Sequence, residues 1–300
     1  MFTGCGTALV TPFREDLSLN EAAVARLVRR QIEAGINFLV PCGTTGESPT
    51  LTHEEHLRVV EITVREAQGK VPVLAGAGGY NTAKVIDLVK ELEALGVDGI
   101  LSVTPYYNKP TQEGLFLHYK AIAAATHLPI VVYSVQGRTG VNVEPATLAR
   151  LAAIDNIVGV KEASGNVAQM ANILHQVPER FTVLSGDDAL TLPLMALGGR
   201  GIISVVSNEI PAEMTALAQA CLQGDFAAAR GYYRRYLPLM NVNFVESNPI
   251  PVKAAMGLMG LLEAYWRLPL VPPAPASLAK IEKVLEESGL LAGRRVPVAG

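Results

Sequence analysis

A lysine lies within an aliphatic run that has the composition of a buried strand: Ile157-Val158-Gly159-Val160-Lys161-Glu162-Ala163-Ser164. Burial disfavours the charged form of an amine, and a neutral lysine amine is a nucleophile that can form a Schiff base with a carbonyl compound. The alternative is a lysine that pairs with a carboxylate for a structural reason. The sequence on either side of this run bears on both interpretations and also indicates the fold.

Eight short aliphatic runs predict eight strands. Most of them do not alternate with polar residues, which is typical of strands covered on both faces, as in a parallel sheet. The predicted strands span residues 7–10, 38–41, 71–75, 99–104, 130–133, 158–161, 182–185 and 202–206.

Helical patterns separate these strands. Apolar residues recur at helical spacing, for instance within residues 24–32, and capping-box patterns at 18–21 and 52–55 predict two helix starts. Eight strands with intervening helices predict an α/β fold, a (β/α)8 TIM barrel over residues 1–224. Residues 225–300 predict a C-terminal helical appendage with a proline-rich break at 268–275 and a loose tail after Leu291.

Composition excludes several classes of protein. The 300 residues are 49% hydrophobic, which is ample for a full core, and the net charge of −3 indicates no nucleic-acid or membrane-surface partner. Three widely separated cysteines argue against a disulfide framework or a cysteine metal site. The sequence contains no apolar run long enough to span a membrane and no signal-like start, so we expect a cytoplasmic protein.

Polar residues at the ends of the predicted strands are candidates for an active site, because TIM barrels carry their chemistry at that rim. Lys161, Tyr133, Tyr107 and the turn 43–46 all fall there. The N–H groups of a Gly-Thr-Thr-Gly turn can bind a carboxylate, although an ordinary βα turn has the same composition. A tyrosine near an imine can carry a proton, and the guanidinium of Arg138 suits a carboxylate.

Other motifs in the sequence are incomplete. Residues 76–81 lack the third glycine of a dinucleotide-binding loop. His53 and His56 are three residues apart on one predicted helix, but no further ligand completes a zinc site, so we expect a solvated helix face. No histidine partner is indicated for Cys42, which argues against a cysteine nucleophile.

Six motifs, in this order and spacing, resemble those of the dihydrodipicolinate synthase family over nearly the whole chain, to about Leu291. They are residues 43–47, 106–108, Tyr133 with 138–140, 159–163, 184–188 and 248–253. The resemblance implies a TIM barrel that condenses pyruvate with L-aspartate 4-semialdehyde in the diaminopimelate route to lysine, without a metal or an organic cofactor.

The resemblance also implies catalytic roles for four residues. Lys161 would form the Schiff base with pyruvate, and Tyr133, Thr44 and Tyr107 would relay protons. Tyr107 would reach into the site of a neighbouring subunit, so that a dimer is the smallest active unit of what is usually a homotetramer, a dimer of dimers.

Four further residues would bind the substrates. Thr45 would hold the pyruvate carboxylate together with Thr44, and Arg138 would hold the carboxylate of the semialdehyde. Gly186 and Ile203 would line the pocket. The sequence departs from the family pattern after Tyr133, where Ser134-Val135-Gln136 replaces Asn-Val-Pro, so the segment carrying Arg138 lacks a rigidifying proline.

A regulatory site is implied as well, because lysine-inhibited members bind L-lysine at the subunit interface. Tyr80 and Lys84 stand where those members carry an amide and a carboxylate, and a cation at Lys84 would repel the ammonium of the effector. We therefore expect weak or absent inhibition by L-lysine. The other residues that match the effector site are Ser48, His53, His56 and Tyr106.

Two other functions fit part of the pattern. A related pyruvate aldolase, such as N-acetylneuraminate lyase or a 2-keto-3-deoxy sugar acid aldolase, would share Lys161, Tyr133 and Thr44. Arg138 and Tyr107 disfavour it, because a polyhydroxylated substrate does not need a second carboxylate clamp. A non-catalytic barrel that binds a keto acid would not need the complete proton relay.

Overall fold

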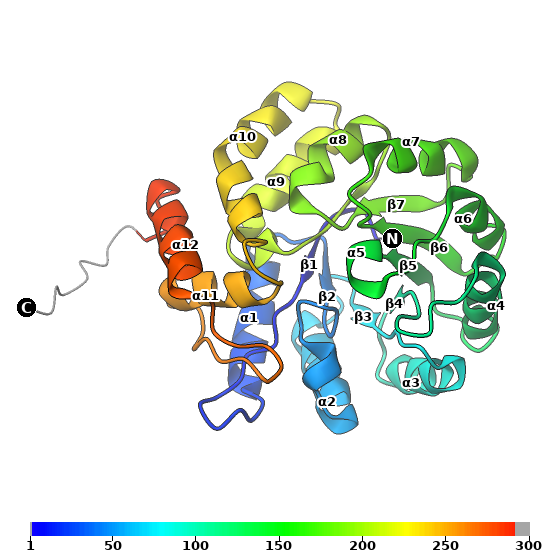
Figure 1. The fold of residues 1–300 in the computed structure, drawn as a ribbon, viewed down its shortest axis with the longest axis horizontal. Coiled ribbons are helices and arrows are strands. Elements are labelled where there is room, and N and C mark those ends of the chain that lie inside the picture. The colour runs from blue at the N-terminus through cyan, green and yellow to red at the C-terminus, as the bar shows by residue number, and fades with distance from the viewer. Residues whose placement is uncertain (1, 292–300) are drawn as a thin grey trace, which may run out of the picture.

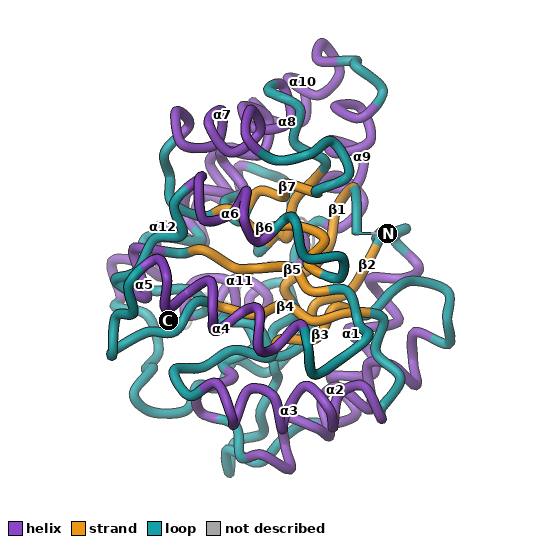
Figure 2. Tube along the Cα trace, turned by 90° about the vertical axis from the view of Figure 1, so that its right-hand side faces the viewer, coloured by secondary structure: helices purple, strands orange, loops and turns teal. Residues whose placement is uncertain are grey.

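The computed structural model describes residues 2–291, and within them eight parallel strands form one sheet in the order β2-β1-β8-β7-β6-β5-β4-β3. A parallel bridge between Leu39 and Val73 joins the two ends of this order, so the sheet closes almost completely into a barrel. The predicted TIM barrel is therefore confirmed, with the strands at the centre and helices around them (Figures 1 and 2). The strands are β1 Gly4–Ala8, β2 Phe38–Val40, β3 Leu74–Gly76, β4 Gly99–Val103, β5 Ile130–Ser134, β6 Ile157–Glu162, β7 Thr182–Ser185 and β8 Gly201–Ser204.

The strands are covered on both faces, as their composition predicts. Side chains such as Phe38, Val131 and Leu184 pack together in the barrel interior. Their neighbours, such as Val132 and Val160, pack in the larger core between the barrel and the helices. This alternation follows from the two-residue period of a strand. It places Lys161, which follows Val160, on the interior face.

The helices begin largely where local sequence directs them. Thr52 and Glu55 form the predicted capping box at the start of α2, each side chain accepting the backbone N–H of the other. The pattern at 18–21 is wrong as a capping box: Asn20 caps α1, while the hydroxyl of Ser18 donates to Asp16 within a preceding turn. The helices around the barrel are α1 Glu21–Glu33, α2 His53–Ala67, α3 Thr82–Ala94, α4 Gln112–Ala123, α5 Gln136–Thr139, α6 Pro145–Leu151, α7 Val167–Gln176, α8 Thr191–Ala196 and α9 Pro211–Leu222, with 3-10 turns η1 Ser48–Thr50, η2 Asp188–Leu190 and η3 Val206–Asn208.

The first strand begins three residues before the predicted 7–10. Positions 4 and 6 are glycines because neighbouring side chains come too close for any other residue. A Cβ atom on Gly6 would lie 2.1 Å from the Phe38 ring, and one on Gly4 would lie 2.2 Å from the Asn37 side chain. A strand with this composition lacks the aliphatic signal on which the prediction depends.

The C-terminal region is helical, as predicted, with α10 Phe226–Val242, α11 Ile250–Leu258 and α12 Pro275–Glu287 (Figure 1). Tyr236 of α10 and Ile281 of α12 belong to the same hydrophobic core as the helices around the barrel. The boundary between residues 224 and 225 stays a prediction, and the tail after Leu291 lies outside the described residues. Across residues 2–291, no helix combines the length and apolar content needed to cross a bilayer.

Candidate active site

Lys161 lies at the carboxyl end of β6 and is only 5% exposed. Its Cα atom pairs with that of Tyr133 on β5, and its Nζ atom is 4.3 Å from the centroid of the Tyr133 ring. It lines a cavity of about 100 Å³ at the carboxyl ends of the strands, which we call the lysine cavity. No ion pair involves Lys161 within residues 2–291, so its amine is buried without a carboxylate partner.

A second buried lysine provides a contrast. Lys253 of α11 is 0% exposed, and its Nζ atom lies 2.6 Å from Oε1 of Glu47. It also donates to the carbonyl oxygens of Thr11 and Tyr265. Burial lowers the pKa of Lys253, and the negative charge of Glu47 opposes that shift. Lys253 therefore fits the structural interpretation of a buried lysine, whereas Lys161 does not.

The turn after β2 carries both threonines of the predicted site. Thr44 lines a larger cavity of about 330 Å³, which we call the outer cavity, and Thr45 lines the lysine cavity. The backbone N–H groups of Gly46 and Glu47 donate to Gly43 and Thr44 within the turn. Those two amides are therefore used internally, and a carboxylate bound here would depend on the hydroxyls and the remaining N–H groups.

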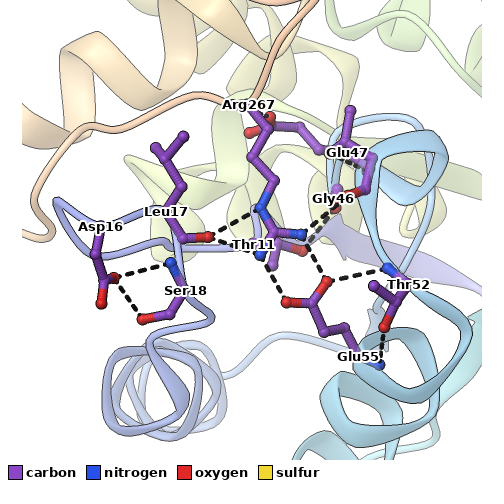
Figure 3. A network of polar contacts seen from close by, with 10 residues as sticks. Thr11, Asp16, Leu17, Ser18, Gly46, Glu47, Thr52, Glu55 and Arg267 are labelled. Carbon is purple, nitrogen blue, oxygen red and sulfur yellow. Dashed lines mark hydrogen bonds and ion pairs between the residues drawn. The ribbon is translucent and has the colours of Figure 1, made fainter.

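Glu47 fixes the end of this turn to the C-terminal region. Its backbone has a left-handed conformation, with φ of 53°, and its carboxylate accepts hydrogen bonds from Lys253 and from the backbone N–H of Arg267. The guanidinium of Arg267 in turn binds both oxygens of Glu55 at 2.6 Å and the carbonyl oxygen of Leu17 (Figure 3). Lys253 and Arg267 thus attach the end of this turn to the C-terminal region.

Arg138 lies in the one-turn helix α5 and lines both cavities. Its Nη2 atom donates to the carbonyl oxygen of Asn248 at 3.1 Å. The side-chain amide of Asn248 donates to Oγ1 of Thr45 at 2.9 Å. Asn248 therefore connects the two groups predicted to hold carboxylates, and Arg138 lies in a helical turn although its segment lacks the proline of the family pattern.

Gly186 and Ile203 have different positions. Gly186 lines the lysine cavity, and a Cβ atom added to it would lie 3.0 Å from Cε of Lys161 and 2.6 Å from Cβ of Ala163. Any residue larger than glycine at position 186 would therefore clash with the side chain of Lys161 in its present conformation. Ile203 is fully buried and packs in the barrel interior with Tyr133, behind the cavities rather than on their walls.

Tyr107 does not reach Lys161 within one chain. It is 91% exposed and does not line the lysine cavity or the outer cavity. Its φ of 62° lies in the left-handed region, which costs a bulky residue on the order of 1–3 kcal/mol. The adjacent Tyr106 is held by an edge-on contact with the Tyr80 ring, with centroids 5.2 Å apart.

The six residues of the predicted effector site divide between two adjoining cavities. Ser48, His56 and Tyr106 line the outer cavity. His53, Tyr80 and Lys84 line a neighbouring cavity of about 390 Å³. Gly78 and Leu88 line both, so the two spaces meet there.

The expected solvated helix face is wrong for His56. Its ring is buried and its Nε2 atom lies 2.9 Å from the carbonyl oxygen of Gly76, at the end of β3. Burial lowers the pKa of His56 to about 4, so the ring is neutral at pH 7 and donates from Nε2. His53 is exposed, and its Nε2 atom lies 2.6 Å from Oε2 of Glu91.

The surroundings of Cys42 disfavour a cysteine nucleophile at this site. Burial raises the pKa of the Cys42 thiol, which keeps it protonated and argues against a cysteine nucleophile. Residues 2–291 contain no group of three or more His, Cys, Asp or Glu side chains that could hold a metal ion.

Sequence reasoning assigned no role to Asn248, Glu47 or Lys253. All three lie within motifs used for the resemblance, 43–47 and 248–253. Their contacts join residues more than 200 positions apart, at separations of 203 and 206. The motifs themselves were the only available signal, because no local pattern reports such a contact.

This chain is similar over nearly its whole length to known proteins. Residues 1–288 match the model of the dihydrodipicolinate synthetase family. A 4-hydroxy-tetrahydrodipicolinate synthase of Koribacter versatilis is 56% identical over 289 residues, which is 96% of each chain. The crystal structure of dihydrodipicolinate synthase from Thermotoga maritima is 49% identical, with a TM-score of 0.95 over 97% of this chain and 100% of that one. The chloride-inhibited enzyme from Acinetobacter baumannii, solved with pyruvate, is 42% identical, with a TM-score of 0.95 over 97% and 100% of the two chains. This chain therefore belongs to the dihydrodipicolinate synthetase family.

Proposed function

We propose that this enzyme is a lyase of the class I aldolase type that joins pyruvate to L-aspartate 4-semialdehyde, the reaction of 4-hydroxy-tetrahydrodipicolinate synthase. One observation carries the proposal: Lys161 is buried in a cavity and has no ion-pair partner among the described residues, unlike Lys253. The relatives named above carry the same activity in their names, and the Acinetobacter baumannii relative was solved with pyruvate.

The chemistry follows from the amine. Nζ of Lys161 attacks the keto carbon of pyruvate, and loss of water leaves a protonated imine. The imine accepts the electrons released when the methyl group loses a proton, which gives an enamine. The enamine carbon attacks the aldehyde, and the amine of the semialdehyde then closes the ring and displaces Lys161.

Proton transfer is proposed to involve Tyr133, Thr44 and Tyr107. Tyr133 lines both cavities and contacts Lys161, and Thr44 lines the outer cavity. The exposure of Tyr107 and its strained backbone support a role in the site of a second subunit. We therefore propose a dimer as the smallest active unit and a homotetramer as the complete assembly.

The carboxylates of pyruvate and of the semialdehyde are proposed to bind to the two residues that Asn248 contacts, Thr45 and Arg138. Thr45 would hold pyruvate and Arg138 would hold the semialdehyde, while Gly186 leaves room for the imine and Ile203 supports Tyr133 from within the barrel.

The three cysteines are free and buried, which supports a cytoplasmic location.

Reduction with borohydride in the presence of pyruvate tests the function. Peptide mapping should find the pyruvate adduct on Lys161, and Lys161→Ala should abolish both the adduct and nearly all turnover. Lys253→Arg serves as the control for a buried lysine outside the chemistry, because its adduct should remain on Lys161. An adduct elsewhere, or normal rates in Lys161→Ala, would contradict the mechanism. Turnover of aspartate semialdehyde in preference to sugar acids separates this enzyme from the related aldolases.

Regulation by L-lysine is proposed to be weak or absent. Lys84 lines the cavity with His53 and Tyr80 and brings a positive charge to a space that would have to accept the ammonium of the effector. A steady-state assay should show little inhibition, and Lys84→Glu should increase it. An inhibition constant in the micromolar range for the unaltered enzyme would refute the proposal.

A further inference from the structure

Asn248 has a hydrogen-bonding group that the fold does not use. Its side chain is 5% exposed and lines the lysine cavity. The amide nitrogen donates to Thr45, but the amide oxygen, Oδ1, has no hydrogen-bond partner among the described residues. A buried acceptor without a donor is destabilising, and in a ligand cavity it indicates that the ligand supplies the donor.

The orientation of the amide agrees with the proposed role of Thr45. Because Nδ2 of Asn248 donates to Oγ1 of Thr45, the hydroxyl proton of Thr45 remains free to bind the pyruvate carboxylate. The opposite orientation would direct that proton to Asn248 instead. Oδ1 is therefore the polar atom of this side chain that no described residue contacts.

The substrates narrow the choice of donor. Pyruvate carries a carboxylate and a ketone and has no N–H or O–H group to donate at neutral pH. L-aspartate 4-semialdehyde carries one strong donor, its α-ammonium group. Asp187 lines the same cavity, so a carboxylate as well as an amide oxygen favours a cation there.

The position of Arg138 adds a geometric argument. In an α-amino acid the carboxylate and the ammonium are attached to the same carbon, so the protein groups that bind them must be neighbours. Nη2 of Arg138 lies 3.1 Å from the backbone oxygen of Asn248. A carboxylate on Arg138 therefore places the attached ammonium next to the residue that has the unused acceptor.

We propose that Oδ1 of Asn248 binds the α-ammonium group of the second substrate and orients its aldehyde toward the enamine. This inference rests on the proposed function. It makes Asn248 a specificity-determining residue that distinguishes an α-amino aldehyde acid from the same chain without an amine. It also predicts that Asn248 variants act on the two substrates separately.

The test compares Asn248→Ala with Asn248→Asp in the full enzyme. Asn248→Ala should raise the KM for L-aspartate 4-semialdehyde about tenfold or more, since a hydrogen bond to a charged group is lost. The inhibition constant of succinate semialdehyde, which lacks the ammonium, should not change. Asn248→Asp keeps an acceptor oxygen at this position, so the KM for L-aspartate 4-semialdehyde should stay near that of the unaltered enzyme. Asn248→Asp should instead raise the KM for pyruvate, because the new carboxylate accepts a hydrogen bond from the Thr45 hydroxyl, which is then no longer free to bind pyruvate. Asn241→Ala, at an exposed position of α10, is the control.

Two results would overturn the inference. One is equal weakening of both semialdehydes by Asn248→Ala, which would mean that Asn248 acts only through Arg138 or Thr45. The other is the same pattern for the alanine and the aspartate variants. Pyruvate trapping on Lys161 separates these failures from failure of the proposed function, because it does not involve the semialdehyde. If Asn248→Ala still forms the pyruvate adduct, and the KM for L-aspartate 4-semialdehyde and the inhibition constant of succinate semialdehyde rise by the same factor, only the proposed role of Asn248 is refuted.

Discussion

Replacing Lys253 by methionine should strongly destabilise the fold. Methionine fills much of the same space but removes the ammonium, which leaves the fully buried Glu47 carboxylate with the backbone N–H of Arg267 at 3.4 Å. Removing one partner of a buried ion pair costs about 3–5 kcal/mol of unfolding free energy. The carbonyl oxygens of Thr11 and Tyr265 lose a donor as well, so we expect the upper part of that range.

The double variant Glu47→Leu/Lys253→Met tests the cause of this loss. It removes both charges, and apolar residues in place of a buried pair are often as stable as the pair itself. Most of the lost stability should therefore return, giving a coupling energy of roughly 2 kcal/mol or more in a double-mutant cycle. Lys280→Met, on the exposed surface of α12, is the control and should change stability little.

Urea unfolding at fixed subunit concentration measures these differences. Trp266 is the single tryptophan, and its ring centroid is 6.0 Å from Nζ of Lys253, so its fluorescence reports on the region. A loss below about 1 kcal/mol in Lys253→Met would show that water or rearrangement compensates the carboxylate. A double variant no more stable than the single one would show that packing, not the unpaired charge, causes the loss.

Three further predictions concern the site and its surroundings. Gly186→Ala should slow borohydride-trapped adduct formation by an order of magnitude or more, because the added Cβ meets Lys161 at 3.0 Å; trapping at the normal rate would contradict this. Tyr107→Phe should slow turnover yet leave the pyruvate adduct, and unchanged kinetics would remove Tyr107 from the relay. Burial raises the pKa of Asp188 to about 6, so the folded state binds this proton more readily than the unfolded state and stability falls as pH rises from about 4 to 6. Asp188→Asn should reduce that slope by up to about 1.4 kcal/mol per pH unit in urea unfolding, and identical slopes would refute the assignment.

Local patterns in the sequence were sufficient to predict the barrel. Val131, Val160 and Ile202 belong to runs whose composition is set by burial on both faces, and those runs became strands. The same patterns placed Lys161 in a buried strand and at the rim where TIM barrels carry their chemistry, and the structure confirms its burial. At Gly4 and Gly6 the strand is buried but has no aliphatic side chains, so the predicted start of this strand was wrong.

Contacts between distant segments could not be predicted in this way. The burial of His56 depends on how α2 packs against the end of β3, which helical spacing alone does not specify. The contact of Thr45 with Asn248 and that of Glu47 with Lys253 depend on the return of the C-terminal helices to the barrel mouth. A pairing of this kind follows from tertiary packing, so the sequence shows its residue types but not its existence.

The attachment of the turn at residues 43–47 to α11 has a consequence for synthesis on the ribosome. All eight strands are complete by Ser204, but Lys253 is 206 residues later in the chain than Glu47. At translation rates of about 5–20 residues per second, Lys253 is synthesised roughly 10–40 seconds after Glu47. A nascent chain can therefore assemble its strands well before the turn that carries Thr44 and Thr45 gains this contact. The predicted site is complete only once most of the last quarter of the polypeptide has been synthesised.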